Sequence, residues 1–333
     1  MALQKRIALT LPMGPVWQDT VDLVEWAESE GFTDGWFSDP GAPDSLTVAA
    51  SLGPYAKTMR IGTAITPVYM RSPAVFAAQA NVLAQIFPGR FVMGLGSSSQ
   101  AIVETFNGIK IEKPLTRVKE TAIMIRHMLS GQKTDFDLST LSSHGYRQMP
   151  LENPPPIYLA GLRPKMVEMA AEIGDGVILN LWPRKALPRL MEHVKIGAER
   201  AGKSWKDIEI VNRAMVWVTD DREEGRARFR AWFAPYYANP VYNKFLKWAG
   251  YADEANGILE GWAARDREKT ASAMTDEMVD EIAIIGTAEE CHERIRQDAE
   301  GGVHTHIIAP IAAELREDAQ PTFDAFTPSR FSF

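Results

Sequence analysis

Cysteine is almost absent from this chain of 333 residues, and long apolar runs are missing too. The single cysteine, Cys291, excludes an intrachain disulfide, and its helix-like surroundings, TAEECHERIRQ, predict a structural thiol. No stretch reaches the roughly 18 apolar residues that a membrane-spanning helix needs. The first residues, MALQKRIALTLP, carry no cleavage-site pattern. We therefore expect a cytoplasmic protein without a membrane partner.

An excess of positive charge is also missing, because 43 acidic residues face 36 basic ones. The formal net charge is −7 and no basic stripe is visible, so we expect no nucleic-acid partner. The six histidines are scattered and none forms an H-E-x-x-H spacing, so we expect no metal site. His304 and His306 alternate at the start of a strand, where a structural role is expected. A G-x-S-x-G nucleophile motif is missing as well, which argues against hydrolytic chemistry.

The chain does contain a regular alternation of strand-like and helix-like segments. Eight strands can be counted, at residues 6–12, 33–39, 59–66, 90–97, 156–162, 176–182, 208–219 and 305–311. Eight such units predict a (β/α)8 barrel, although the count alone is also consistent with an open doubly wound sheet. We expect one domain, residues 1–333, with insertions at about 132–155 and at 221–285. The second insertion follows the seventh strand and is predicted to be wholly helical.

The third predicted helix, near residues 72–87, has an apolar line formed by Val75, Val82 and Ile86, flanked by Phe76 and Leu83. These positions fall on one side of a helix with 3.6 residues per turn. The line is predicted to pack against the strands.

Functional residues of a (β/α)8 barrel lie in the loops that follow the strands. After the fifth strand, Gly161 permits a sharp turn and Pro164 suits the first position of a helix. Free amides there, with Arg163, would bind a phosphate, but an ordinary turn has the same residues. The segment GLGSSS after the fourth strand either holds a cofactor or is simply a polar loop. In the third strand, Gly62 indicates a bulge, or a close approach of a ligand or of another backbone segment.

The stretch FRAWFAPYYANPVYNKFLKWAGY, in the second insertion, is unusually aromatic. Two interpretations remain open: a lid over an apolar pocket, or a core or subunit interface. Trp182, at the end of the sixth strand, is a candidate wall of the pocket in either case.

Two long segments resemble the bacterial-luciferase-like superfamily of flavin and deazaflavin oxidoreductases. They are GFTDGWFSDPGAPDSLTVAASLGPYAKTMRIGTAITPVYMRSPAVFAAQANVLAQIFPGRFVMGLGSSS and PIYLAGLRPKMVEMAAEIGDGVILN. The Pro-Lys-Met after the turn looks most like the branch that uses coenzyme F420, as in methylene-tetrahydromethanopterin reductases. The likeness covers roughly residues 5–182, and the closing segment IIGTAEECHERIRQDAEGGVHTHIIAP is also similar.

The resemblance implies where the cofactor binds. It implies a bulge with a cis peptide between Ala64 and Ile65, against one face of the cofactor ring. It places the phosphate at the turn after the fifth strand and the hydroxyls of the cofactor tail beside the fourth. The cofactor-binding residues implied in this way are Thr63, Ala64, Ile65, Ser97, Ser98, Gly161, Leu162 and Arg163.

Three positions depart from the family pattern. Pro40 stands where relatives commonly have a histidine that can transfer protons, Ser99 stands where some have a carboxylate, and Arg163 precedes Pro164 where Gly-Pro is usual. Asp39 is retained, and we expect it to contact the ring or to handle a proton. Ser99 and Trp182 are expected in the substrate pocket.

The sequence therefore predicts an oxidoreductase in which F420 exchanges hydride with a small, rather apolar organic substrate. A monooxygenase that uses flavin mononucleotide (FMN) is the alternative, and a non-catalytic flavin-binding protein is a third possibility. We also expect a homo-oligomer, with a dimer as its simplest form.

Overall fold

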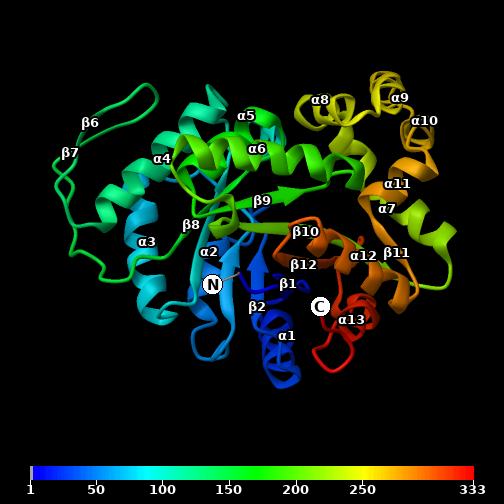
Figure 1. Ribbon diagram of the computed structural model, residues 1–333, viewed down its shortest axis with the longest axis horizontal. Coiled ribbons are helices and arrows are strands. Elements are labelled where there is room, and N and C mark those ends of the chain that lie inside the picture. The colour runs from blue at the N-terminus through cyan, green and yellow to red at the C-terminus, as the bar shows by residue number, and fades with distance from the viewer. Residues whose placement is uncertain (1–2) are drawn as a thin grey trace.

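The computed structural model describes residues 3–333, and its centre is a closed barrel of eight parallel strands (Figure 1). The predicted (β/α)8 architecture is thereby confirmed, and the open sheet is excluded because β9 pairs with β10. Each predicted strand is present. The barrel strands are β1 (Arg6–Leu11), β2 (Asp34–Phe37), β3 (Arg60–Thr63), β5 (Phe91–Gly96), β8 (Ile157–Ala160), β9 (Gly176–Asn180), β10 (Glu209–Val218) and β12 (Thr305–Pro310).

The barrel interior is filled by alternate residues of these strands. A cluster of Ala8, Trp36, Val92, Tyr158, Ile178, Val211 and Ile307 lies inside. Nearer the start of the strands, the guanidinium of Arg60 lies 2.5 Å from the carboxylate of Asp34 and 2.7 Å from the carboxylate of Glu209. Burial by itself would raise the pKa of Glu209, but the hydrogen bond and charge of Arg60 hold it at about 2. An ion-pair network therefore closes this end of the barrel, where the strands begin.

Helices cover the outside of the barrel, and the N-termini of three of them are capped by short polar side chains. Asp44, Ser72 and Thr287 each accept a hydrogen bond from a backbone amide of the first turn. The covering helices are α1 (Trp17–Glu30), α2 (Ser45–Ser51), α3 (Pro73–Ile86), α4 (Pro114–Leu129), α5 (Pro164–Ile173), α6 (Leu187–Arg200), α12 (Ala288–Glu300) and α13 (Arg316–Ala325).

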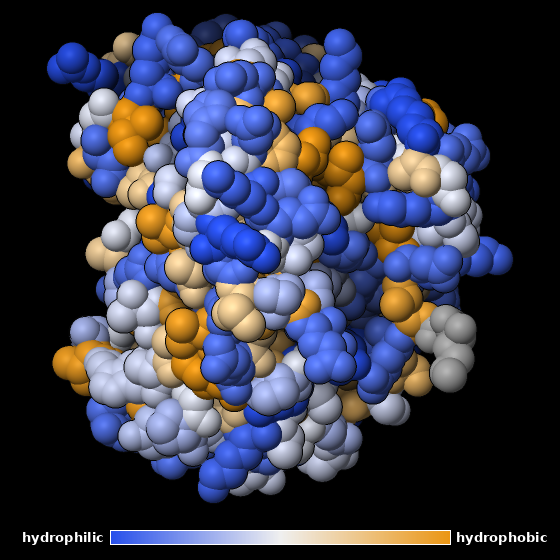
Figure 2. All heavy atoms as spheres, turned by 90° about the vertical axis from the view of Figure 1, so that its left-hand side faces the viewer, coloured by the Kyte–Doolittle hydropathy of each residue, from blue (hydrophilic) through white to orange (hydrophobic). Residues whose placement is uncertain are grey.

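The prediction for the third helix is wrong in its orientation. Val75 and Val82 are exposed, at 45% and 53% of their surface, whereas Phe76 and Leu83 are buried. The buried side of α3 also contains Ala77 and Ala80, whose small side chains let the helix lie close to the barrel. Figure 2 views the side of the molecule that carries α3 and α4, where apolar side chains form separate orange groups among blue polar ones.

The two insertions lie at different ends of the view in Figure 1. Residues 132–155 contain a hairpin of β6 (Asp135–Asp137) and β7 (Ser142–His144). The second insertion contains α7 (Arg222–Ala238), α8 (Pro240–Ala249), α9 (Ala252–Ala263), α10 (Arg267–Ser272) and α11 (Asp276–Ile282). It is not wholly helical, because it ends in a short strand, β11 (Ile284–Gly286), which pairs with the last residues of β10.

The aromatic stretch of the second insertion has two kinds of side chain. Phe229, Phe233, Tyr237, Phe245 and Tyr251 are buried within the chain, whereas Trp232 and Tyr236 are about half exposed, at 47% and 46%. The buried aromatic rings hold α7 and α8 together and supply a core for the insertion.

Cys291 is buried, and burial raises the pKa of its thiol to about 12. A thiol in this setting stays protonated and unreactive at neutral pH, in agreement with the structural role predicted for it. Within residues 3–333 no helix is both long and apolar enough to cross a membrane, and no group of side chains is arranged to hold a metal ion.

Candidate active site

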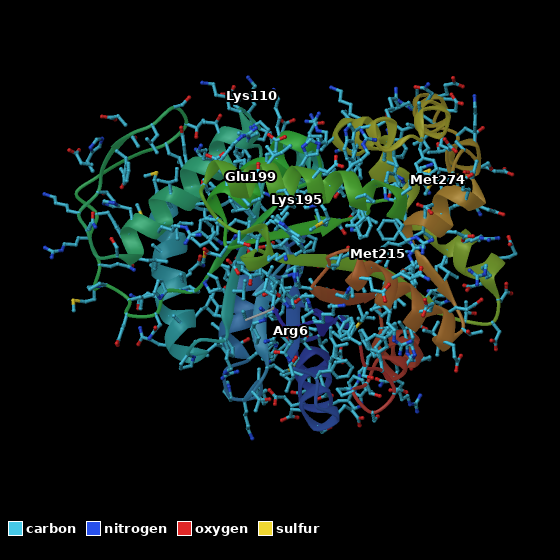
Figure 3. All side chains as sticks on the ribbon, in the orientation of Figure 1. Arg6, Lys110, Lys195, Glu199, Met215 and Met274 are labelled. Carbon is cyan, nitrogen blue, oxygen red and sulfur yellow. The ribbon has the colours of Figure 1, made fainter. Side chains whose placement is uncertain are left out.

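The strand ends that carry the predicted site residues all lie at one end of the barrel, because the strands are parallel. Figure 3 labels Arg6, the first residue of β1, and Met215, in the second half of β10. The loops after β2, β3, β5, β8 and β9 therefore meet around the same opening.

The bulge after β3 lies in this opening. The peptide bond between Ala64 and Ile65 is cis, as expected, and both residues are half buried against the barrel-interior cluster. The amide of Ala64 donates to the carbonyl oxygen of Phe37 at 2.6 Å, which fixes the bulge to the end of β2. Both residues of the cis peptide therefore keep part of their surface exposed.

The small residues around the bulge serve the packing of the protein itself. A Cβ on Gly62 would lie 2.5 Å from the indole of Trp36, so this glycine makes room for a core side chain rather than for a ligand. On the neighbouring strand, a Cβ on Gly96 would lie 2.9 Å from the side chain of Ile65. Gly62 thus gives room to Trp36, whereas Gly96 provides space for the side chain of the bulge residue Ile65.

Thr63 anchors the start of the bulge. Its hydroxyl donates to the carbonyl oxygen of Gly94 at 2.8 Å and accepts from the amide of Gly94 at 2.9 Å. Because this hydroxyl already donates one hydrogen bond and accepts another, its role is to position the bulge. A contact from Thr63 to a cofactor would therefore have to come from its backbone.

Asp39 is buried beside the bulge and is held by its own neighbours. Its carboxylate accepts from the hydroxyl of Ser45 at 2.8 Å and from the amide of Gly41 at 3.2 Å, and it lies 3.5 Å from the guanidinium of Arg71. The Ser45 oxygen is also 3.1 Å from that of Thr66. Since the Ser45 proton goes to Asp39, Thr66 must donate to Ser45, and a chain of hydrogen bonds links Asp39 to the strand that follows the bulge.

The three serines after β5 differ in what they do. Ser97, Ser98 and Ser99 are all half buried, and Ser98 has a positive φ of 62°. The hydroxyl of Ser99 accepts a long hydrogen bond, 3.4 Å, from the amide of Ile102 at the start of a π-helical turn, Ala101–Phe106. Ser99 therefore has a local capping role in addition to any role toward a substrate.

The turn after β8 leads directly into α5. Pro164 is the first helical residue, as predicted, and Arg163 is the N-cap residue with an exposed side chain. Gly161 is required here because a Cβ on it would lie 2.9 Å from the backbone of Val167. Within the described residues, the amides of Leu162, Arg163 and Lys165 have no hydrogen-bond acceptor. Such amides at a helix N-terminus suit the oxygens of an anion.

Trp182 lies apart from this group of residues. Its indole nitrogen donates to the side-chain oxygen of Asn212 at 2.9 Å, and its ring is buried with the side chains that pack between the barrel and the helices. A small cavity of about 10 Å³ lies beside it and is also lined by Asn212, Arg294 and Asp298. The structure thus brings Asp39, the bulge, the serines and the α5 turn to one opening, and Trp182 flanks that opening from outside.

A polar group on β9 and β10 was not predicted from the sequence. Asn180 and Arg213 are partners in register on these two strands. The side-chain amide of Asn180 donates to the hydroxyl of Tyr242 on α8 at 3.2 Å. The signal was available, because an arginine in the apolar run IEIVNRAMVWVT is unusual for a buried strand.

Comparison with known proteins agrees with this architecture. A family model described as luciferase-like monooxygenase matches residues 1–305. The chain belongs to this family. It is 29% identical over 304 residues to a 5,10-methylenetetrahydromethanopterin reductase of Archaeoglobus fulgidus, a match that covers 89% of this chain and 91% of the relative.

Two solved structures show that the likeness extends over the whole fold. One is the coenzyme F420-dependent tetrahydromethanopterin reductase of Methanopyrus kandleri, with a TM-score of 0.77, 20% identity, and coverage of 96% of this chain and 99% of the other. The second is the oxygenating constituent of 3,6-diketocamphane monooxygenase of Pseudomonas putida in complex with FMN, with a TM-score of 0.67, 16% identity, and coverage of 98% and 96%. At these identities the structures establish the fold alone.

Proposed function

We propose that this protein is an F420-dependent oxidoreductase that transfers hydride to or from a small organic substrate. The observation that carries the proposal is the likeness, along about nine-tenths of the chain, to a methylenetetrahydromethanopterin reductase. Members of the same fold family that bind FMN make an FMN-dependent monooxygenase the alternative. Both cofactors carry a phosphate on a flexible tail and a flat ring, so the same site could receive either one.

The residues at the barrel mouth fit such a cofactor. The free amides of Leu162, Arg163 and Lys165 and the side chain of Arg163 would bind its phosphate. The half-buried backbone of Ala64 and Ile65 would support one face of its ring. Ser97 and Ser98 would bind hydroxyls of its tail.

When bound, a deazaflavin supplies the hydride chemistry at its ring carbon. The chain itself then has to orient the ring, exclude water and handle the accompanying proton. We assign proton handling to Asp39, which is linked through Ser45 to Thr66 beside the bulge. Pro40 can take no part in it, because its side chain carries no titratable group.

The cofactor assignment is tested by titrating the purified apoprotein with F420 and, separately, with FMN, while following the fluorescence of each. We expect saturable binding of F420 with an affinity at least tenfold higher than that of FMN. Preferential binding of FMN would overturn the assignment in favour of the monooxygenase. Binding of F420 without turnover of any electron acceptor would favour a binding protein.

A further inference from the structure

Arg213 is a charged residue on the inner face of the barrel. Side chains two residues apart on a strand point to the same face, and Val211 belongs to the barrel-interior cluster. The register confirms this, because Arg213 is paired with Ile307 of β12, which belongs to the same cluster. Arg213 therefore points inward, one layer closer to the barrel mouth than Val211.

Arg213 has no counter-ion within the described residues. Its Nε atom is buried without a hydrogen-bond partner, and one terminal nitrogen makes a weak contact, 3.7 Å, with the sulfur of Met215. Burial lowers the pKa of this guanidinium, and its electrostatic partners are the phenols of Tyr236 and Tyr242 rather than carboxylates. Arg60, at the other end of the barrel, shows the usual arrangement with two carboxylates.

The groups around Arg213 are also incompletely paired. Asn180 donates to Tyr242, but its side-chain oxygen is buried and has no hydrogen-bond partner among residues 3–333. Because the Tyr242 hydroxyl accepts that bond, its own proton is free to be donated. Burial raises the pKa of Tyr242, so this proton is retained at neutral pH. A guanidinium and a phenol can thus donate together to one anionic group.

We propose that Arg213, together with Tyr242, binds a carboxylate of the substrate, so that the substrate is an organic acid rather than a neutral molecule. A guanidinium presents two parallel N–H groups that match a carboxylate. The inference rests on the proposed function, and it revises the expectation of a rather apolar substrate. Tyr236 of α7 and Tyr242 of α8 are the aromatic neighbours of Arg213 and would contact such an acid beside its carboxylate.

The cofactor phosphate is a less suitable occupant of this position. The free amides of the α5 turn follow β8, whereas Arg213 lies on β10, and β9 separates these two strands. Two separate sites for negative charge are therefore present at the barrel mouth, one for each partner in the reaction.

The experiment uses benzoate as the carboxylate probe, benzamide as its neutral analogue and phenyl phosphate as the competing anion. Each is titrated by calorimetry into the protein saturated with F420. For the wild type we expect benzoate to bind about tenfold or more tightly than benzamide, as a charge-assisted hydrogen bond predicts, and more tightly than phenyl phosphate. Arg213→Met should remove this preference, and Arg213→Lys should retain part of it. Arg267→Met, at an exposed position on α10, is the matched control and should bind benzoate like the wild type.

Two further readouts separate this role from a structural one and from the proposed cofactor site. Arg213→Met should keep its affinity for F420 within about twofold, and its thermal unfolding midpoint without ligand should equal or exceed that of the wild type, because the substitution breaks no ion pair and removes a half-buried charge. A lowered midpoint would assign Arg213 to stability, and a lost affinity for F420 would assign it to the cofactor; either result overturns the inference. Equal binding of benzoate and benzamide by the wild type, or saturable binding of neither, would also overturn it. Failure of the wild type to bind F420 contradicts the proposed function instead, and the same titrations without cofactor then test Arg213.

Discussion

The carbonyl oxygen of Thr63 occupies the place that a side chain on Gly94 would need. A Cβ built on Gly94 would overlap this oxygen, and the hydroxyl of the same threonine bonds both the amide and the carbonyl of Gly94. The position of the bulge therefore depends on the absence of a side chain one strand away.

We expect Gly94→Ala to lower the free energy of unfolding by about 1–3 kcal/mol, the usual cost of overpacking a core, and to weaken cofactor binding. Denaturant unfolding and the cofactor titration measure the two effects. Gly257→Ala on α9 is a suitable control, because its new Cβ would approach Ala273 at 3.0 Å, far from the bulge. Unchanged cofactor affinity in a destabilised Gly94→Ala would show that the bulge does not support the ring.

Arg163→Ala should weaken cofactor binding with little loss of stability. Arg163 is exposed, and it can add a charge-assisted hydrogen bond to the phosphate, worth about 1–3 kcal/mol, at the N-terminus of α5. Fluorescence titration gives the affinity and thermal unfolding gives the stability. Arg330→Ala serves as a control for a surface arginine elsewhere. A folded Arg163→Ala protein with wild-type affinity would place the phosphate at another site.

His306 should make the protein less stable in mild acid. It is fully buried on β12, neither ring nitrogen has a hydrogen-bond partner within residues 3–333, and burial, with smaller effects of Lys5 and His304, lowers its pKa to about 3. In the unfolded chain the pKa is about 6.5, so between these values the unfolded state alone takes up a proton. The stability contributed by neutral His306 is therefore complete above about pH 6.5 and is lost as the pH falls toward 3.

His306→Leu tests this pH dependence. Between pH 7 and pH 5, the wild type should lose about 2 kcal/mol more unfolding free energy than this variant, measured by urea denaturation at each pH. His144 is the exposed control; a hydrogen bond to Asp135 raises its pKa, so His144→Gln should not reduce the loss in acid. If the unfolding free energies of the wild type and of His306→Leu fall by the same amount between pH 7 and pH 5, the prediction is contradicted.

Hydrogen exchange distinguishes the lid from the interface interpretation of residues 229–251. If α7 and α8 open to admit substrate, their amides should exchange faster than those of the barrel strands and slow down when cofactor and benzoate bind. If they form a subunit interface, protection should be high without ligand and should fall on dilution. Mass spectrometry at two protein concentrations, with and without ligand, measures both. If the protection of these amides from exchange falls on dilution and does not change when ligand binds, the lid interpretation is excluded.

The strands were predictable because a closed parallel barrel imposes one repeated pattern on the whole sequence. The turn at Gly161 and Pro164 was equally readable, since each residue there has a specific backbone property. The buried side of α3 was misjudged because large apolar residues lie all around this helix. Close packing selected the side with Ala77 and Ala80, and the size of side chains alone does not reveal that choice.

The parts of the site that escaped sequence analysis depend on contacts between distant strands. Gly62 correctly indicated a bulge nearby, but the group that approaches the glycine itself is Trp36, a side chain of another strand, rather than a ligand. The pairing of Arg213 with Asn180 follows from the register of β9 and β10. The missing counter-ion of Arg213 could be recognised only once every neighbouring side chain had been placed.

The helical insertion leaves and rejoins the barrel at a single place. Val218 at the end of β10 is paired with Gly286 of β11, and the amide of Thr219 donates to the carbonyl oxygen of Gly286 at 2.9 Å. The two ends of a segment of more than sixty residues are thus joined by a hydrogen bond. The helices of this segment take no part in the pairing of the eight barrel strands. Evolution can lengthen, shorten or replace this insertion without rebuilding the barrel, so the chemistry at the strand ends and the choice of substrate can change independently.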